Sequence, residues 1–320
     1  MTNLDEVTVA LTRPSSDAPG PLDNRLFDLV EGRFRRLLRD HPTFATFTGI
    51  HTGDHRLGVG TLDAVHEEMA ADRRHLAAVE AIDPVGLSDT AKLERDLEIH
   101  NLRRSNFDAE VHRVWERRST AMDDVGDALF AVFARDFAPL PERLASITGR
   151  LEETPRFLAE HRTRAVRPPV RMWQELELRS AEEMPGFFDE IVAAGHGVLG
   201  DAEARRLARA TEVAKEAVAT YADWLRGTLA AAVDDWPLGR DKYDELIRLR
   251  AFEGLDADAI LAIGHQQLAE NKAARVRAAR EIDPHVDEPT VVTGSSAITR
   301  RRSRRRWTPI ATSWSGHAAT

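Results

Sequence analysis

The strongest constraint on the fold is a long run of apolar residues spaced by three and four positions. It lies within Asp201–Asp234, and its members are Leu207, Ala210, Ala214, Val218, Tyr221, Leu225 and Leu229. An α-helix of 3.6 residues per turn places such positions on one face, so the run predicts an amphipathic helix that buries this face. We expect it to be the longest helix of the chain.

Similar spacing recurs along most of the sequence. It predicts an all-α protein, a multi-helix array of long amphipathic helices without significant sheet. Asn24 is a candidate cap for a first helix around Phe27–Leu37, and Ser88 is a candidate cap for another. The remaining helices are predicted at Leu62–Ala81, Val125–Phe137, Pro141–Glu153, Pro155–Arg164, Val170–Ala194, Asp241–Arg250 and Asp256–Ile282.

The sequence divides into three regions. Residues 1–21 are polar and rich in turn-forming residues, so we expect a flexible lead-in, and the only strand-like alternation, "EVTVALT", lies within it. Residues 22–290 are expected to form the helical domain. Residues 291–320 hold six arginines within seven positions, no acid, and Pro309, which interrupts any helix there. We expect this basic tail to be disordered.

Charge and composition narrow the function classes. The chain carries a net charge of −9, and the tail contributes +6 of it, so the rest carries −15 and should repel nucleic acid and anionic membranes. The absence of cysteine excludes disulfides, thiolate nucleophiles and cysteine-ligated zinc. The sequence shows no secretory signal and no apolar run of the roughly 18 residues that a membrane span needs. The predicted location is the cytoplasm.

A glycine-rich stretch after the first predicted helix holds the first candidate site. In "IHTGDH", His51, Asp54 and His55 have the side chains and the spacing to bind a divalent metal. The same residues are more typical of a surface loop whose polar side chains bond nearby backbone groups, and no further ligand set matches them. We therefore expect no metal site in this chain and keep these residues as the alternative.

The second candidate lies on the helix predicted after Ser88. Asp96 and His100 are four residues apart on one helix face, with Arg103 adjacent. A carboxylate that orients an imidazole is a general-base arrangement, although such pairs are also common on helix surfaces. The sequence contains no HExxH, GxSxG, GxxxxGK(S/T) or GxGxxG motif, and "HEEMA" at His66–Ala70 lacks the second histidine of a zinc motif.

Four stretches resemble a known family in their order and spacing. They are "HPTFATFTGIHTGDHRL", "LERDLEIHNLRRSNFD", "RPPVRMWQELELRSAEEMPGFF" and "PLGRDKYDELIRLRAFEGLDADAILAIGHQQL". Over about Leu22–Glu288 the chain resembles the N-terminal half of the bacterial domain of unknown function 885 family. The resemblance implies a mostly helical protein related to zincin metallopeptidases, with a zinc motif of the HExxPGH type in its C-terminal half. This chain lacks that motif and holds only the helical half that would wall a substrate cleft.

The same resemblance implies a helical continuation beyond Glu288, which the arginine-rich tail does not offer. A single-nucleotide shift near Val291–Thr293 would explain this. Read one base earlier with plausible codons, Ile298–Trp314 decodes as "DHPTTFEEALDAYRDVM", whose apolar residues recur at helical steps. We therefore predict that residues 291–320 are out of frame.

These inferences give one leading function and two alternatives. The leading hypothesis is a truncated N-terminal helical half of a zincin-like metallopeptidase family protein, without catalysis of its own. Zinc and a peptide-like substrate then belong to full-length relatives, and an exposed apolar face would allow self-association. The alternatives are a self-sufficient helical scaffold or binding module, and a nucleic-acid binder that acts through the arginine-rich tail, against which the charge of −15 argues.

Overall fold

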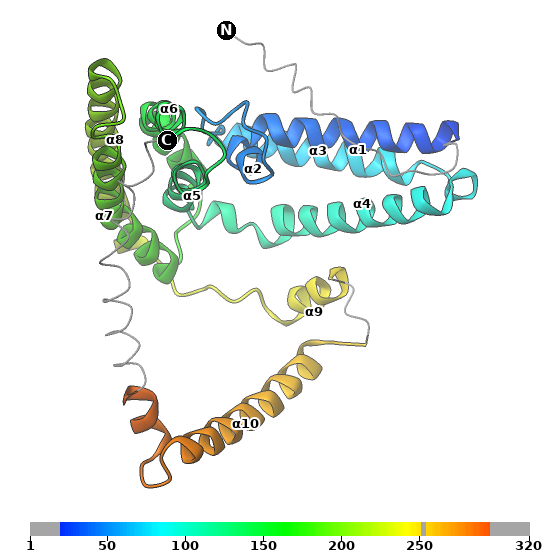
Figure 1. Ribbon diagram of the computed structural model, residues 1–320. Coiled ribbons are helices and arrows are strands. Elements are labelled where there is room, and N and C mark those ends of the chain that lie inside the picture. The colour runs from blue at the N-terminus through cyan, green and yellow to red at the C-terminus, as the bar shows by residue number, and fades with distance from the viewer. Residues whose placement is uncertain (1–19, 251–253, 295–320) are drawn as a thin grey trace, which may run out of the picture. The chain divides into compact units, whose positions relative to one another are not determined.

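The computed structural model describes residues 20–250 and 254–294 (Figure 1). The chain divides after Arg250 into two compact units. Regular structure in the described ranges is helical: they contain no β-strand, and an isolated parallel bridge joins Val170 to Val233. The predicted all-α fold is confirmed. No helix in these ranges is both long enough and apolar enough to cross a bilayer.

Ten α-helices are named along the described ranges. They are α1 (Pro21–Asp40), α2 (Pro42–Phe47), α3 (Leu62–Glu80), α4 (Asp89–Phe107), α5 (Ala121–Ala134), α6 (Leu140–His161), α7 (Arg171–Ala194), α8 (Asp201–Thr228), α9 (Arg240–Leu249) and α10 (Ala257–Ile282). Short turns of other helix types lie at Pro84–Gly86, Asp108–His112, Val114–Glu116, Arg162–Arg164 and Leu229–Ala231. As expected, α8 is the longest helix, although it ends at Thr228 rather than at Asp234.

The two helices predicted on either side of Pro155 are one continuous helix, α6. A proline inside a helix removes one backbone hydrogen bond and costs about 3 kcal/mol. Tertiary packing offsets this cost, because α6 is buried at positions along its whole length between α5 and α8. Pro185 lies inside α7 in the same way.

The helix starts show which capping predictions are right. Ser88 caps α4 as predicted, since its hydroxyl accepts a hydrogen bond from the Ala91 backbone N–H at 3.3 Å. Asn24 is not a cap: α1 begins three residues earlier at Pro21, after Gly20. Proline suits the first helical position because its missing N–H would have no partner there. The glycine-rich stretch is also partly helical, since α2 precedes its loop.

The first unit has two main apolar cores. Helices α1, α3 and α4 enclose one that includes Leu26, Phe27 and Val79. The larger core lies among α5–α8, where the predicted apolar face of α8 is buried. Helix α2 packs against both α1 and α5, and so links the two groups of helices (Figure 1).

Glu177 joins α7 to the start of α5 inside the larger core. Its Oε1 accepts a hydrogen bond from the Met122 backbone N–H at 2.9 Å and lies 3.0 Å from the Tyr221 hydroxyl. The Met122 N–H is one of the donors that the first turn of a helix leaves without an internal partner. Burial raises the pKa of Glu177 to about 7, and the two hydrogen bonds act in the opposite direction.

Arg150 of α6 is fully buried and connects three other segments. Its guanidinium donates to the Ala128 carbonyl of α5, to the Arg56 carbonyl at 3.1 Å and to the Thr46 hydroxyl of α2 at 2.7 Å. The Thr46 hydroxyl donates in turn to Asp54 Oδ1 at 2.5 Å, and this buried carboxylate lies 3.9 Å from the guanidinium. Burial lowers the pKa of Arg150 to about 10, so it stays charged at neutral pH.

The second unit is described through α10 and a short helical segment at residues 288–294. The Asp256 side chain caps α10 by accepting from the Ala259 N–H at 2.8 Å. In its own unit α10 buries only Ala279, and it leaves Leu261, Leu268 and Ile282 exposed. Residues 1–19 and 295–320 lie outside the described ranges. The expectations for "EVTVALT", the lead-in at 1–21 and the arginines of the tail therefore stay predictions.

The Arg150 network predicts a large loss of stability on truncation. Arg150→Ala should lower the free energy of unfolding by about 3–5 kcal/mol, because Asp54 stays buried without its counter-charge. Chemical denaturation followed by circular dichroism measures this value. Arg206→Ala, which breaks the solvent-exposed pair with Glu152 from α8 to the same α6, should cost no more than about 1 kcal/mol. Equal losses in the two variants would contradict a special role of Arg150.

Candidate active-site cleft

A cleft of about 1210 Å³ opens between the N-terminal helices α1–α3 and the ends of α5 and α6. Its apolar lining includes Phe44, Phe47, Leu57 and Phe157. Its charged lining comprises six arginines and six acids: Arg33, Arg36, Arg39, Asp40, Arg56, Glu67, Glu68, Asp72, Arg74, Asp124, Asp127 and Arg164. The cleft is therefore electrostatically balanced, with aromatic surface between the charges.

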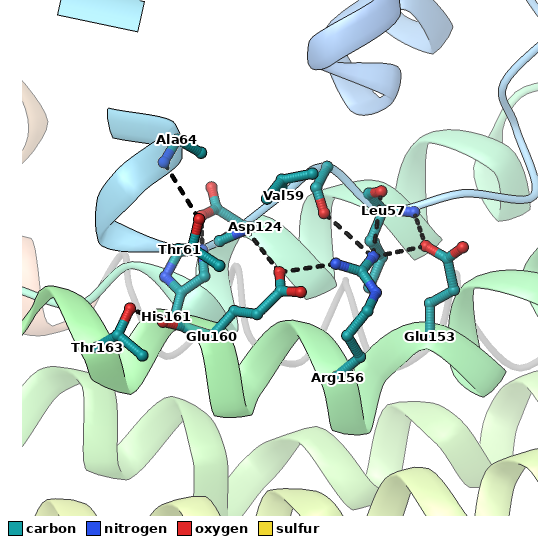
Figure 2. A network of polar contacts seen from close by, with 12 residues as sticks. Leu57, Val59, Thr61, Ala64, Asp124, Glu153, Arg156, Glu160, His161 and Thr163 are labelled. Carbon is teal, nitrogen blue, oxygen red and sulfur yellow. Dashed lines mark hydrogen bonds and ion pairs between the residues drawn. The ribbon is translucent and has the colours of Figure 1, made fainter. Parts of the chain in front are cut away.

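The segment between α2 and α3 forms one wall of the cleft and is fastened to α6 through its backbone. The Leu57 N–H donates to Glu153 Oε2 at 2.7 Å, and the Gly60 N–H donates to Glu160 Oε2 at 2.8 Å. Figure 2 shows these carboxylates pointing from α6 toward the segment. Because loop backbone groups lack the partners that a helix supplies, side chains of α6 take their place.

Arg156 completes this contact from between the two glutamates. It forms ion pairs with Glu153 at 2.9 Å and Glu160 at 2.7 Å, and it donates to the Gly58 carbonyl at 3.2 Å (Figure 2). Steps of three and four residues place these side chains on one face of α6. Thr61 then ends the segment by capping α3 through the Ala64 N–H. A polar stripe on α6 thus fixes the course of the loop.

Asp124 and His161 face each other across the cleft floor. Asp124 lies in the first turn of α5, His161 is the last residue of α6, and their Oδ2 and Nε2 atoms are 3.7 Å apart (Figure 2). The imidazole is only 3% exposed, whereas the carboxylate side chain is 47% exposed and reaches the cleft. At 3.7 Å the two groups are in contact without a direct hydrogen bond.

The surroundings shift both groups away from their ordinary titration. Although its side chain is partly exposed, desolvation by the surrounding cleft floor raises the pKa of Asp124 to about 6, while the Thr120 hydroxyl at 3.2 Å and Arg164 favour its charged form. Burial, with the positive charge of Arg164, lowers the pKa of His161 to about 3. At neutral pH a carboxylate thus stands beside a neutral imidazole. Asp124 can therefore take up or release a proton near neutral pH, as a general acid or base does, while His161 stays neutral.

His41 and Glu68 form a second polar pair on the cleft lining. His41 Nε2 lies 3.0 Å from Glu68 Oε1, and this hydrogen bond raises the pKa of His41. Both side chains are more than 40% exposed, so the pair is open to solvent. It brings α3 to the start of α2 and adds a further titratable group to the cleft lining.

The first predicted candidate does not form a cluster around an ion. His51 Nδ1 lies 2.8 Å from Asp54 Oδ2, and its ring stacks on Phe137 at 3.6 Å between centroids. Asp54 is directed into the Arg150 network, while His55 is exposed and its backbone packs against Gly149. In the described ranges no group of three or more histidines, cysteines or acids is arranged to hold a metal.

The second predicted candidate is dispersed along the surface of α4. Asp96 pairs with Arg95 at 3.2 Å, and Arg103 pairs with Glu80 of α3 at 2.7 Å. No hydrogen bond or ion pair joins Asp96 to His100 in the part of the chain that the structure describes. None of these residues lines the cleft.

Asp124, His161 and Arg164 are not predicted from the sequence. Asp124 is one of three acids at the start of α5, and His161 stands in "AEHRTR", so neither belongs to a motif with a recognisable spacing. The only sequence signal is the set of polar residues at steps of three and four along α6, which a helical plot would place on one face of that helix. These residues become neighbours because the end of α6 packs against the start of α5. The start of α5 lies more than thirty residues earlier in the chain than the end of α6.

The fold and the cleft define an all-α protein with a large open cleft. The profile of DUF885, described as bacterial protein of unknown function, matches residues 42–307. The chain belongs to this family, as its motifs predicted. The match continues past Val291 and through the arginine-rich segment.

Other comparisons show the fold alone. A search of curated proteins finds no match. One solved structure with the same fold is described as "a putative lipoprotein of unknown function from Shewanella oneidensis". It aligns with a TM-score of 0.65 at 17% sequence identity, over 83% of this chain and 48% of that chain. This chain therefore spans about half the length of that structure.

Gly60 is predicted to be intolerant of any side chain. A Cβ atom at this position would overlap Cδ2 of the buried His161 ring and lie 3.2 Å from Glu160 Cβ. Gly60→Ala should therefore destabilise the fold by about 1–3 kcal/mol, as overpacking does. Gly32→Ala, at an exposed position inside α1 with nothing within 4 Å, should instead stabilise it by about 0.5–1 kcal/mol. Denaturant titration of both variants tests the close approach, and a stable Gly60→Ala protein would contradict it.

The raised pKa of Asp124 predicts how the stability of the protein depends on pH. Its pKa is about 6 in the folded state and near its ordinary value of 3.8 in the unfolded chain, so the folded state binds more protons between these values. Raising the pH from 4 to 7 should therefore stabilise Asp124→Asn relative to the natural protein. The lowered pKa of His161 changes stability with pH in the opposite direction. Because both proteins contain His161, its contribution cancels in the difference between their free energies of unfolding.

Denaturant unfolding at several pH values from 4 to 7.5 measures this difference. Asp123→Asn removes the same charge from the adjacent residue, whose side chain is 54% exposed, and serves as the control for general charge effects. A difference between Asp124→Asn and the natural protein that does not change with pH would contradict the environment described for Asp124.

Proposed function

We propose that this chain supplies the helical, ligand-binding half of a larger protein related to zincin-like metallopeptidases, and that a peptide-like ligand occupies the cleft. The cleft volume of about 1210 Å³ carries the proposal. Sites for small molecules usually enclose about 300–1,000 Å³, so this cleft is large enough for an extended ligand of several residues.

The chemistry of the lining supports a peptide more than a nucleic acid. Arginines in the cleft are matched by acids: Arg33 and Arg36 both bind Asp72, at 3.2 and 2.8 Å. Nucleic acid would require a clear excess of positive charge. Exposed aromatic surface at Phe44 and Phe47 instead suits apolar side chains of a ligand.

We propose no hydrolysis by this chain alone. It contains no HExxH motif, and the described residues offer no group of three metal ligands. Zinc would have to be held by sequence that this chain does not contain. Asp124 and His161 would then bind the ligand and hold protons at the cleft floor.

Two further observations support the proposal that this chain is one part of a larger protein. The chain spans 48% of the solved structure that shares its fold. In its own unit, α10 leaves Leu261, Leu268 and Ile282 exposed, which is the expected state of a helix that another protein segment covers. The same face would also allow the self-association that the sequence analysis anticipates.

A self-sufficient helical binding module is the alternative, because the cleft lies within the first unit and needs no other segment. The nucleic-acid alternative rests on arginines outside the described ranges and stays a prediction, as does the cytoplasmic location. The out-of-frame origin of residues 291–320 also stays a prediction. The family match through residue 307 counts against a shift at Val291.

Calorimetric titration tests the proposal with a pentapeptide that contains two phenylalanines, and with free phenylalanine. The full chain should bind the pentapeptide more tightly, because the amino acid fills little of the cleft. Phe44→Ser should weaken peptide binding at least about tenfold, since full burial of a phenylalanine side chain by a ligand contributes about 1.5–3 kcal/mol. EDTA should leave the affinity unchanged, and mass spectrometry should find the peptide intact.

Phe130→Ser is the matched control, because Phe130 is 56% exposed on α5 and does not line the cleft. Equal weakening in the two variants, or no binding by the folded protein, would refute the peptide cleft. Cleavage that EDTA prevents would refute the absence of catalysis.

A further inference from the structure

A second pocket, of about 270 Å³, lies on the other side of the His161 wall. It is bounded by residues 114–120, by the end of α6 with its following turn, and by the ends of α7 and α8 that contain Gln174 and Trp224. Its charged lining is uneven, with five arginines and a single acid: Arg117, Arg118, Arg162, Arg164, Arg167 and Glu116. This excess distinguishes it from the balanced cleft.

Two of these arginines form no ion pair with a carboxylate within 4 Å in the described ranges. Arg162 instead contacts Trp224, with its guanidinium 5.5 Å from the centre of the indole ring. Arg164 donates to the backbone carbonyls of Gly60 at 2.7 Å and Val59 at 3.2 Å. Burial lowers the pKa of Arg164, and the carboxylates of Asp124, Glu68 and Glu160 act in the opposite direction from the cleft side.

The other three arginines are only weakly neutralised. Arg118 lies 3.5 Å from Asp123, and Arg117 lies 3.7 Å from Asp235. Both of those carboxylates are more than half exposed, and ion pairs open to water contribute little. The buried Glu116 is shared between Arg113 and Arg167, with Oε2 3.8 Å from Arg167. One acid therefore offsets only part of the charge around the pocket.

Aromatic surface completes the lining. Trp224 packs against the buried Tyr221 with ring centres 5.3 Å apart, and Trp115 is held by a hydrogen bond from its indole N–H to the Ala109 carbonyl at 2.9 Å. Both indoles therefore have fixed positions. Guanidinium groups bind carboxylate and phosphate oxygens through paired N–H donors, while a fixed indole accepts an apolar or flat group.

We propose that this pocket binds a small organic anion, a carboxylate or phosphate monoester attached to an apolar body, with Arg162 and Arg164 on the anionic group and Trp224 beside the body. The inference is independent of the peptide cleft, although Thr120, His161 and Arg164 line both spaces. An anion bound here would stand behind the imidazole that faces Asp124.

Tryptophan fluorescence and calorimetry of the full chain test this with phenylacetate and phenyl phosphate as probes. Both should bind saturably, the uncharged 2-phenylethanol should not, and inorganic phosphate should bind more weakly than phenyl phosphate. The two anionic probes distinguish a carboxylate from a phosphate site. Arg162→Gln should weaken binding at least about tenfold, because it removes a charge-assisted hydrogen bond.

Arg226→Gln is the matched control. Arg226 lies on α8 two residues from Trp224, carries the same charge, pairs with Glu182 and Asp223, and does not line the pocket. It should keep the natural affinity, and the melting temperature should confirm that both variants fold. Equal weakening in both variants, no saturable binding, or inorganic phosphate binding as tightly as phenyl phosphate would overturn the proposal. Phe44→Ser should not change anion binding, so failure here is separable from failure of the peptide cleft.

Discussion

The course of the loop between α2 and α3 depends on the polar face of α6. Arg150, at the buried end of that face, donates to Arg56, Thr46 and Ala128, and so holds the loop, α2 and α5 at once. A buried guanidinium must fill its donors, since unpaired buried charge is costly. Further along, Glu153 and Glu160 accept from loop N–H groups. One helix therefore supplies the hydrogen bonds that this loop cannot make for itself.

This attachment creates the chemistry of the cleft. Once Gly60 lies against the ring of His161, no side chain fits there and water is largely excluded from the imidazole. The same packing leaves Asp124 beside His161 at the floor, with its pKa raised to about 6 while that of His161 falls to about 3. In acid, Asp124 is protonated before His161 and gives the ring no counter-charge. The packing that buries His161 thus also lowers its pKa.

The two pockets on either side of His161 differ in their balance of positive and negative charge. Around the cleft, acids and arginines balance and several are paired, as Asp72 is with Arg33 and Arg36. Around the smaller pocket, Arg162 and Arg164 form no close ion pair with a carboxylate in the described ranges. Balanced charge suits an extended neutral or mixed ligand, while excess charge suits a compact anion. Arg164 contributes to both, since it lies where the two spaces meet.

The sequence by itself determined the helices, because the spacing of apolar residues and a cap such as Ser88 act over one or two turns. It also determined the family, through motifs in their order. Tertiary structure alone decided that α6 continues through Pro155, since burial along the helix offsets the lost hydrogen bond. It also decided that Asp124 meets His161, and that Asp54 lies beside the buried Arg150. These outcomes depend on partners from about thirty to one hundred residues apart, and no local spacing encodes such contacts.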